Sequence, residues 1–67
     1  MKFEELDVIK VVSDFPEHGI VKGEIGAIVV AFTYPKEAYE VEFVNDDGTT
    51  KAMFTILSEN LEKYNSN

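Results

Sequence analysis

The sequence predicts an all-β domain, a small five-stranded barrel with a long first loop and a single helical turn before the last strand. Runs rich in β-branched and aromatic residues occupy residues 6–12, 26–33, 38–44 and 50–57, and turn-forming residues separate them. Within the third run, apolar and acidic side chains alternate as in a strand with one buried face. The sequence contains no heptad pattern and no internal repeat. A barrel suits such short strands because it leaves few exposed edges.

Length and composition predict one globular domain that covers residues 1–67. The chain has no cysteine, which excludes disulfides, thiolate nucleophiles and cysteine-based zinc sites. Small secreted domains usually depend on such cross-links, so we expect a cytoplasmic location. The N-terminus is acidic rather than signal-like, and no apolar run approaches the ~18 residues of a membrane span. We therefore expect no contact with a membrane.

The chain is strongly acidic, with 13 Asp and Glu residues against 6 lysines, no arginine and a net charge of −7. Nucleic-acid binding depends on basic side chains that neutralise phosphates, so a phosphate backbone would repel this chain at long range. The chain also lacks arginine, the side chain that most often recognises guanine through two hydrogen bonds. The charge therefore disfavours nucleic acid and favours a protein partner with a basic surface.

A long loop joins the first two predicted strands. The first strand, at residues 6–12, ends before a segment that contains Pro16, which lacks the backbone donor that a central strand needs. The second strand, at residues 26–33, is apolar at nearly every position. We expect it to be buried on both faces, or to have one face covered by the long loop.

The third and fourth strands form a hairpin. Residues 38–44 place Tyr39, Val41 and Phe43 on the core face and Glu40 and Glu42 on the solvent face. Residues 45–48 read Asn-Asp-Asp-Gly, a sequence that adopts the left-handed conformations of a tight turn. In the fourth strand, at residues 50–57, the predicted core side chains are Ala52, Phe54 and Ile56.

The last segment is predicted to be a short turn followed by the closing strand. Ser58 is a suitable N-cap for a single helical turn. Residues 61–64 fit either a strand or a continued helix, because Leu61 and Tyr64 have helical spacing. A small barrel needs a closing strand, which favours the strand. Residues 65–67 are predicted to fray.

Several segments give the chain a family resemblance. They are L-D-V-I at residues 6–9, D-F-P-E-H-G at 14–19, K-G-E-I-G at 22–26, Y-E-V-E-F-V at 39–44 and D-G at 47–48. With them the chain resembles, over about residues 3–61, a family of small bacterial and cyanobacterial proteins catalogued as a domain of unknown function. The resemblance implies an SH3-like barrel, related in shape to KOW-type barrels, and no catalytic residue. Some members lie beside predicted toxin or nuclease genes, which implies an antitoxin or immunity role. The chain departs from the family at Phe15, Ala27 and Val30, which marks a candidate apolar contact patch.

The motifs that could carry chemistry are incomplete. His18 lies near Asp14 and Glu17, but no second histidine or cysteine completes a metal-ligand set and no nucleophile is placed beside it. The glycines at 19, 23 and 26 match neither a dinucleotide fingerprint nor a P-loop. We therefore expect no enzymatic activity, no catalytic or metal-binding residue and no cofactor.

The leading hypothesis is a non-enzymatic protein-binding module, of the antitoxin or immunity type, whose partner has a basic surface. One alternative is a KOW-like nucleic-acid-binding barrel, which would need Lys10, Lys22 and Lys51 to cluster. The other is a homo-oligomeric structural module that uses the apolar second strand as its interface. The predicted contact residues are exposed loop aromatics, the loop histidine and acids that face solvent: Phe15, Glu17, His18, Tyr34, Glu40 and Glu42.

Overall fold

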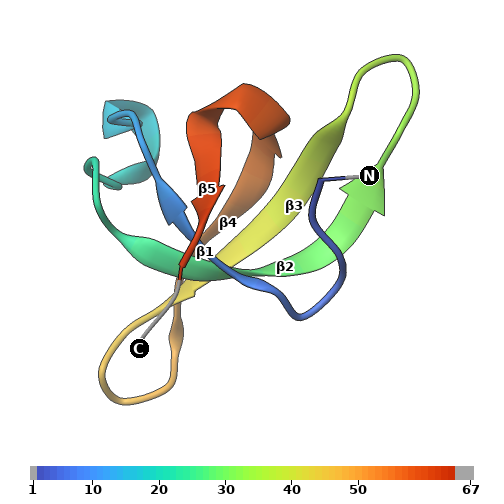
Figure 1. Ribbon diagram of the computed structural model, residues 1–67. Coiled ribbons are helices and arrows are strands. Elements are labelled where there is room, and N and C mark those ends of the chain that lie inside the picture. Colours follow the sequence, from blue (N-terminus) through green and yellow to red (C-terminus); the bar gives the residue numbers. More distant parts are fainter. Residues whose placement is uncertain (1, 65–67) are drawn as a thin grey trace.

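The computed structural model describes residues 2–64, which form one curved sheet of five antiparallel strands with two short 3-10 turns (Figure 1). The strand order across the sheet is β4-β3-β2-β1-β5. Within this part of the chain there is no helix long and apolar enough to cross a membrane. In chain order the elements are β1 (Val8–Val11), η1 (Pro16–His18), β2 (Ile25–Phe32), β3 (Ala38–Val44), β4 (Thr50–Leu57), η2 (Ser58–Asn60) and β5 (Leu61–Lys63).

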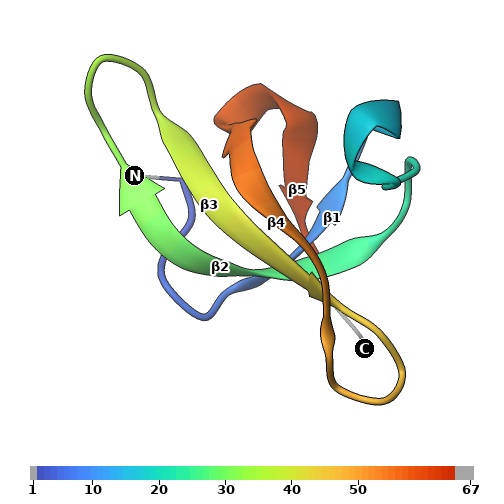
Figure 2. The same ribbon diagram turned by 180° about the vertical axis from the view of Figure 1, so that it is seen from behind.

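The predicted all-β, SH3-like arrangement is confirmed, and so are the long first loop and the single helical turn before the last strand. The last segment is a strand, because Leu61 pairs with Val11 of β1. One correction concerns closure. Figures 1 and 2 show β4 and β5 joined through the short turn η2, yet within residues 2–64 no ladder pairs these two strands, so the sheet stays open at this seam between them. The expected fraying of residues 65–67 lies outside the described residues.

The first strand begins later than predicted. The chain makes a tight turn before β1, in which the Asp7 amide donates to the Glu4 carbonyl at 3.0 Å and the Glu4 amide donates to the Asp7 carboxylate at 3.0 Å. Leu6 within this turn has a φ of 72°, which no strand residue adopts. The turn therefore shortens β1 at its start, although the Leu6 amide still donates to the Ile28 carbonyl at 2.8 Å and the Ile28 amide to the Asp7 carbonyl at 2.9 Å.

The core consists of the side chains on the inner face of the sheet. The predicted inward residues of β3 are buried, and Phe54 and Ile56 of β4 join them, with Ala52 packed against the group. A residue that the sequence did not indicate, Phe3, is buried as well and packs edge-on against the Tyr39 ring at 5.3 Å. The buried cluster is Phe3, Ile9, Val11, Ile20, Ile28, Tyr39, Val41, Phe43, Phe54, Ile56 and Leu61.

The sequence predicted that the second strand would be buried on both faces, or covered on one face by the long loop. Neither is the case. The register of this strand against β3 shifts between Ile28 and Val30, so a bulge changes which residues point inward. Ile28 is buried, whereas Val30 and Phe32 keep 40% and 42% of their surface exposed. The long loop does not cover the outer face of β2, because its apolar side chains pack at the seam of the sheet instead.

At the seam, the β1–β2 loop packs against Phe54 of β4. The Phe15 ring meets the Phe54 ring at 5.3 Å, and the His18 ring stacks on the Phe54 ring with centroids 3.7 Å apart and planes 6° from parallel. Ile20, which is buried, forms an isolated bridge with Phe15. Side chains from the loop therefore pack on the inner face of β4, where Phe54 belongs to the buried cluster.

The N-terminal segment is held by a chain of hydrogen bonds that runs through Tyr39. The buried Tyr39 hydroxyl accepts a bond from the Phe3 amide at 3.0 Å and donates one to the Glu37 carboxylate at 3.0 Å. The same carboxylate oxygen accepts a bond from the Lys2 amide at 2.8 Å. These two donors, with the Lys2 amide foremost, lower the pKa of Glu37, while burial raises the pKa of Tyr39.

Candidate interaction face

The side of the sheet that faces away from the core carries most of the exposed apolar side chains. We call it the outer face. Seven of the ten large apolar side chains that are exposed within residues 2–64 lie on it or at its end. Six come from strands and the seventh, Tyr34, comes from the β2–β3 loop and is 88% exposed. The seven residues are Val8, Ile25, Val30, Phe32, Tyr34, Val44 and Met53.

The strand register arranges the outer face in rows, because residues directly opposite one another in antiparallel strands point to the same side. Phe32 of β2 lies opposite Ala38 of β3, which lies opposite Leu57 of β4. The next row is Val30, Glu40 and Thr55. A third row runs across four strands, through Val8, Ala27, Glu42 and Met53. Two glutamates therefore occupy the middle of a surface that is otherwise largely apolar.

The first row lies in a shallow hollow of about 370 Å³ with mainly apolar walls. Tyr34 and Pro35 form one side of this hollow, and Thr55 connects it to the second row. A smaller hollow of about 230 Å³ lies at the other end of the outer face. Its walls are Val8, Ile25, Gly26, Ala27, Glu42 and Val44.

Threonines of β4 hold the two glutamates in place. The Thr55 hydroxyl donates to Glu40 Oε1 at 2.7 Å, and the Thr50 hydroxyl donates to Glu42 Oε2 at 2.7 Å. Each carboxylate has a second oxygen with no hydrogen-bond donor among residues 2–64. Both glutamates are half-buried, between the solvent and the apolar neighbours in their rows. The arrangement presents two oriented acceptors that a cation from outside the chain can reach.

The six residues predicted as partner contacts fall into two separate groups. Glu40 and Glu42 are on the outer face, and Tyr34 reaches the same area because Thr55 both lines its hollow and bonds Glu40. The other group is the β1–β2 loop, where Phe15 and His18 contact Phe54 from the core side of β4. Glu17 lies with them in η1 and is exposed.

For His18, the stacking contact gives a structural role that the sequence did not indicate. The sequence predicted His18 as a partner contact in the loop, after weighing it as a metal ligand or a catalytic group. In the structure one face of its ring is packed on Phe54, 3.7 Å away. Its place therefore depends on aromatic packing between distant segments, which local sequence does not reveal.

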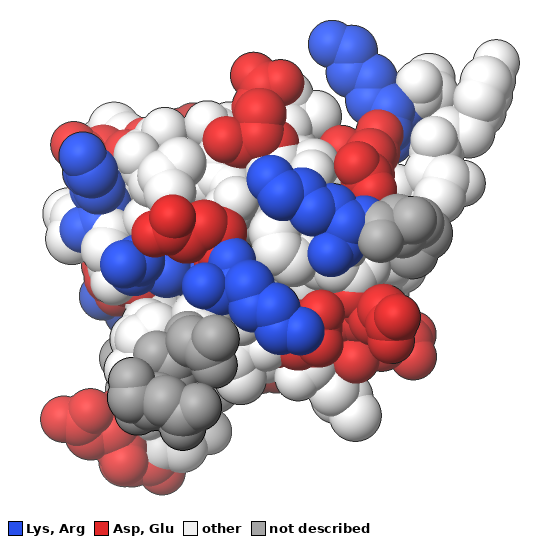
Figure 3. All heavy atoms as spheres, viewed as in Figure 1, with Lys and Arg blue, Asp and Glu red and all other residues white. Residues whose placement is uncertain are grey.

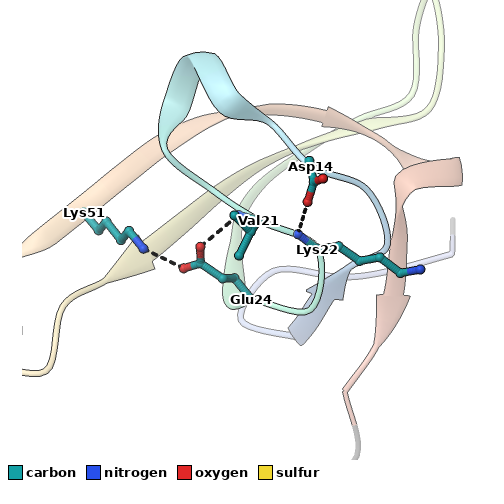
Figure 4. A network of polar contacts seen from close by, with 5 residues as sticks. All are labelled: Asp14, Val21, Lys22, Glu24 and Lys51. Atoms are coloured by element: carbon teal, nitrogen blue, oxygen red, sulfur yellow. Dashed lines mark hydrogen bonds and ion pairs between the residues drawn. The ribbon is translucent and has the colours of Figure 1, made fainter.

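Two carboxylates of the β1–β2 loop, those of Asp14 and Glu24, hold the loop itself (Figure 4). Asp14 accepts a bond from the Lys22 amide at 2.7 Å. Glu24 accepts one from the Val21 amide at 2.9 Å and a charged one from the Lys51 ammonium at 2.8 Å. The Lys51 bond and then the Val21 bond lower the pKa of Glu24. Because Lys51 belongs to β4, this ion pair ties the loop to the strand that it covers.

On the face shown in Figure 3, lysine and acidic side chains lie next to one another. Lys10 pairs with Glu62 at 3.2 Å, and Lys51 pairs with Glu24. These pairs offset the positive charge of two of the three lysines that nucleic-acid binding would need to bring together. A phosphate backbone would have to compete with those carboxylates for them.

The outer face had one signal in the sequence. A second strand that is apolar at nearly every position has too many apolar residues for one core face, so some of them must be exposed or covered by another molecule. The homo-oligomer alternative used that observation. The sequence did not predict the bulge at residues 28–30, and this bulge determines that Val30 and Phe32 are the exposed apolar residues of β2.

Comparisons with known proteins give one match. A family model described as "Domain of unknown function (DUF4926)" matches residues 5–63. Searches of the curated proteins and of the solved structures found no match. The family match covers all five strands of the sheet.

Proposed function

The chain belongs to the family described as a domain of unknown function (DUF4926), and from that premise we propose that it is a non-enzymatic protein-binding module. The proposed binding surface is the outer face. The observation that carries the proposal is the concentration there of exposed apolar side chains, which includes two aromatic rings. Large exposed apolar patches on a soluble domain mark interaction sites, because leaving them in water is unfavourable.

The proposed partner is a different protein with basic groups, rather than a second copy. Two copies docked through the outer face would bring Glu40 and Glu42 of one against the same residues of the other. Like charges in a desolvated contact are unfavourable, and each chain has a net charge of −7, which adds long-range repulsion. A basic partner satisfies the same carboxylates and is attracted by the whole field of the chain.

An antitoxin or immunity protein is the narrower form of this proposal, acting in the cytoplasm of a bacterium. Its support is the family resemblance in the sequence, together with the acidic charge. Enzymes that act on nucleic acids present basic surfaces to phosphates, and an acidic module is suited to cover such a surface. The apolar rows would then supply the affinity, and the charges would supply association rate and selectivity.

A pair of matched substitutions tests the proposal. Val30→Ser changes an apolar residue of the outer face, and Val21→Ser makes the same change in the β1–β2 loop, where the side chain is 58% exposed. Tagged wild-type and variant chains are recovered from the native host. We expect a stoichiometric protein with the wild type and with Val21→Ser, and at least a tenfold loss with Val30→Ser, equivalent to about 1.4 kcal/mol.

Two results would contradict the proposal. One is the absence of any stoichiometric protein partner. The other is equal retention of the partner by both serine variants, which would place the contact elsewhere. Light scattering on the purified wild type addresses the homo-oligomer alternative: a dimer that Val30→Ser abolishes would replace the basic partner with a second copy.

A further inference from the structure

We propose that the outer face recognises an extended segment in which one apolar and two basic side chains occupy every second residue, with the apolar one at either end of the three. The apolar side chain enters the 370 Å³ hollow beside Tyr34, and the basic ones meet Glu40 and Glu42. This inference rests on the proposed function and specifies the chemistry of the partner.

The spacing comes from β3 itself. Ala38, Glu40 and Glu42 alternate with the core residues of this strand, so they point to the outer face two residues apart; Ala38 is buried there, in the wall of the hollow. Two residues of an antiparallel strand span about 6.8 Å. The hollow, which Ala38 lines, and the two carboxylates therefore lie in a line at regular intervals. An extended peptide places the side chains of one face at the same interval, so a single segment can reach all three points.

The carboxylates are suited to this role because their orientation is already fixed. Each has one oxygen held by a threonine hydroxyl at 2.7 Å, which leaves one oxygen for a ligand. Side chains held in place before binding lose less conformational freedom on association. One accessible oxygen per carboxylate also suits the single point charge of a lysine, whereas a bidentate arginine contact would need both oxygens.

The apolar neighbours strengthen the same contacts. Glu40 has Val30 beside it on β2, and Glu42 has Met53 beside it on β4. The methylene stem of a lysine can lie on such side chains while its ammonium reaches the carboxylate. Covering the rows also removes water from the ion pairs, which lowers the local dielectric constant and increases their Coulomb attraction.

The probe is a pair of acetylated, amidated peptides, Ser-Leu-Ser-Lys-Ser-Lys-Ser and its reverse, because the segment can run in either direction along β3. Each is titrated into isotope-labelled chain, with amide shifts followed by NMR at about 0.01 M ionic strength, where charges are little screened. We expect one of the two to shift amides of β2, β3 and β4 on the outer face. A peptide with Glu in place of Lys, and one with Ser in place of Leu, should each bind at least tenfold more weakly.

The matched variants carry the same change of charge. Glu40→Gln with Glu42→Gln keeps the threonine hydrogen bonds but removes both charges, and should weaken binding at least tenfold. Glu5→Gln with Glu59→Gln removes two charges from exposed positions outside the strands and should change binding less than twofold. Amide spectra of the free variants verify that each is folded.

Two results overturn the inference. The first is the absence of shifts on the outer face with both peptides at millimolar concentration, and the second is equal weakening by the two double variants. The proposed function has a separate outcome. If the native partner is lost with Val30→Ser while both peptides fail, the outer face binds by another geometry. If the partner survives Val30→Ser, the proposed function fails as well.

Discussion

Replacing Tyr39 with phenylalanine removes one buried hydroxyl and leaves the shape of the ring unchanged. That hydroxyl is the acceptor for the Phe3 amide and a donor to Glu37, so the variant leaves a buried N–H group without its partner. An unsatisfied buried donor costs about 1–3 kcal/mol. A domain of this size has a total stability of about 3–5 kcal/mol, so the change removes a substantial part of it.

Urea denaturation followed by far-UV circular dichroism measures this loss. With an m-value of about 1 kcal/mol per molar urea, which suits a small domain, the midpoint should fall by about 1–3 M while m is unchanged. The matched control is Tyr34→Phe, the same substitution at a side chain that is 88% exposed and bonds to nothing within residues 2–64. It should change the stability by less than about 0.5 kcal/mol. Equal midpoints for the two variants would refute the role assigned to the Tyr39 hydroxyl.

Three further predictions concern stability. The pKa values of Glu24 and Glu37 are lowered in the folded chain, so their stabilising contributions are complete above the ordinary value of 4.5 and are lost as the pH falls through the folded values. Urea midpoints should therefore drop on acidification, and less steeply in Glu37→Gln; an unchanged slope contradicts this. Gly26→Ala would place a Cβ 2.8 Å from Val41 Cγ1 and 2.9 Å from the Glu42 carbonyl oxygen, both in β3. The urea midpoint of this variant should therefore fall by an amount equivalent to about 1–3 kcal/mol. A variant as stable as the wild type would show that β2 and β3 are farther apart than this. His18→Ala should lower the free energy of unfolding by about 0.5–1.5 kcal/mol, because the stacking on Phe54 is lost, whereas His18→Phe should keep that stacking. Equal thermal midpoints for the two variants would exclude the stack.

The elements that the sequence predicted best are those fixed by local alternation. The bounds of β3 and β4 agree with the predicted ranges, because a strand with one buried and one solvated face has a two-residue period that can be recognised without knowing its partners. The hairpin between them follows from turn residues at the right distance. The segment at residues 61–64 could not be decided in this way, since its strand conformation depends on pairing with β1, far away in the chain.

The features that sequence reasoning missed all depend on contacts between distant segments. Phe3 is buried because Tyr39, 36 residues later, accepts its amide hydrogen bond. His18 is packed because Phe54 lies beneath it. The bulge in β2 arises from the register with β3, and it decides which apolar residues become exposed. None of these leaves a periodic or compositional trace near the residue concerned.

The structure also changes where the candidate function should be sought. The β1–β2 loop carries the sequence's most distinctive residues, yet Phe15 and His18 pack on Phe54, and two of its acids, Asp14 and Glu24, bond its own backbone and Lys51. Side chains already engaged in this way must break those contacts before they can serve a partner, at a cost comparable to the gain. Within residues 2–64, the apolar side chains of the outer face have no such contacts to lose, and each of its two glutamates has one oxygen without a hydrogen-bond donor. Binding there requires little rearrangement, so the face of β2 and β3, rather than the loop, is the surface on which a rigid docking contact is least costly.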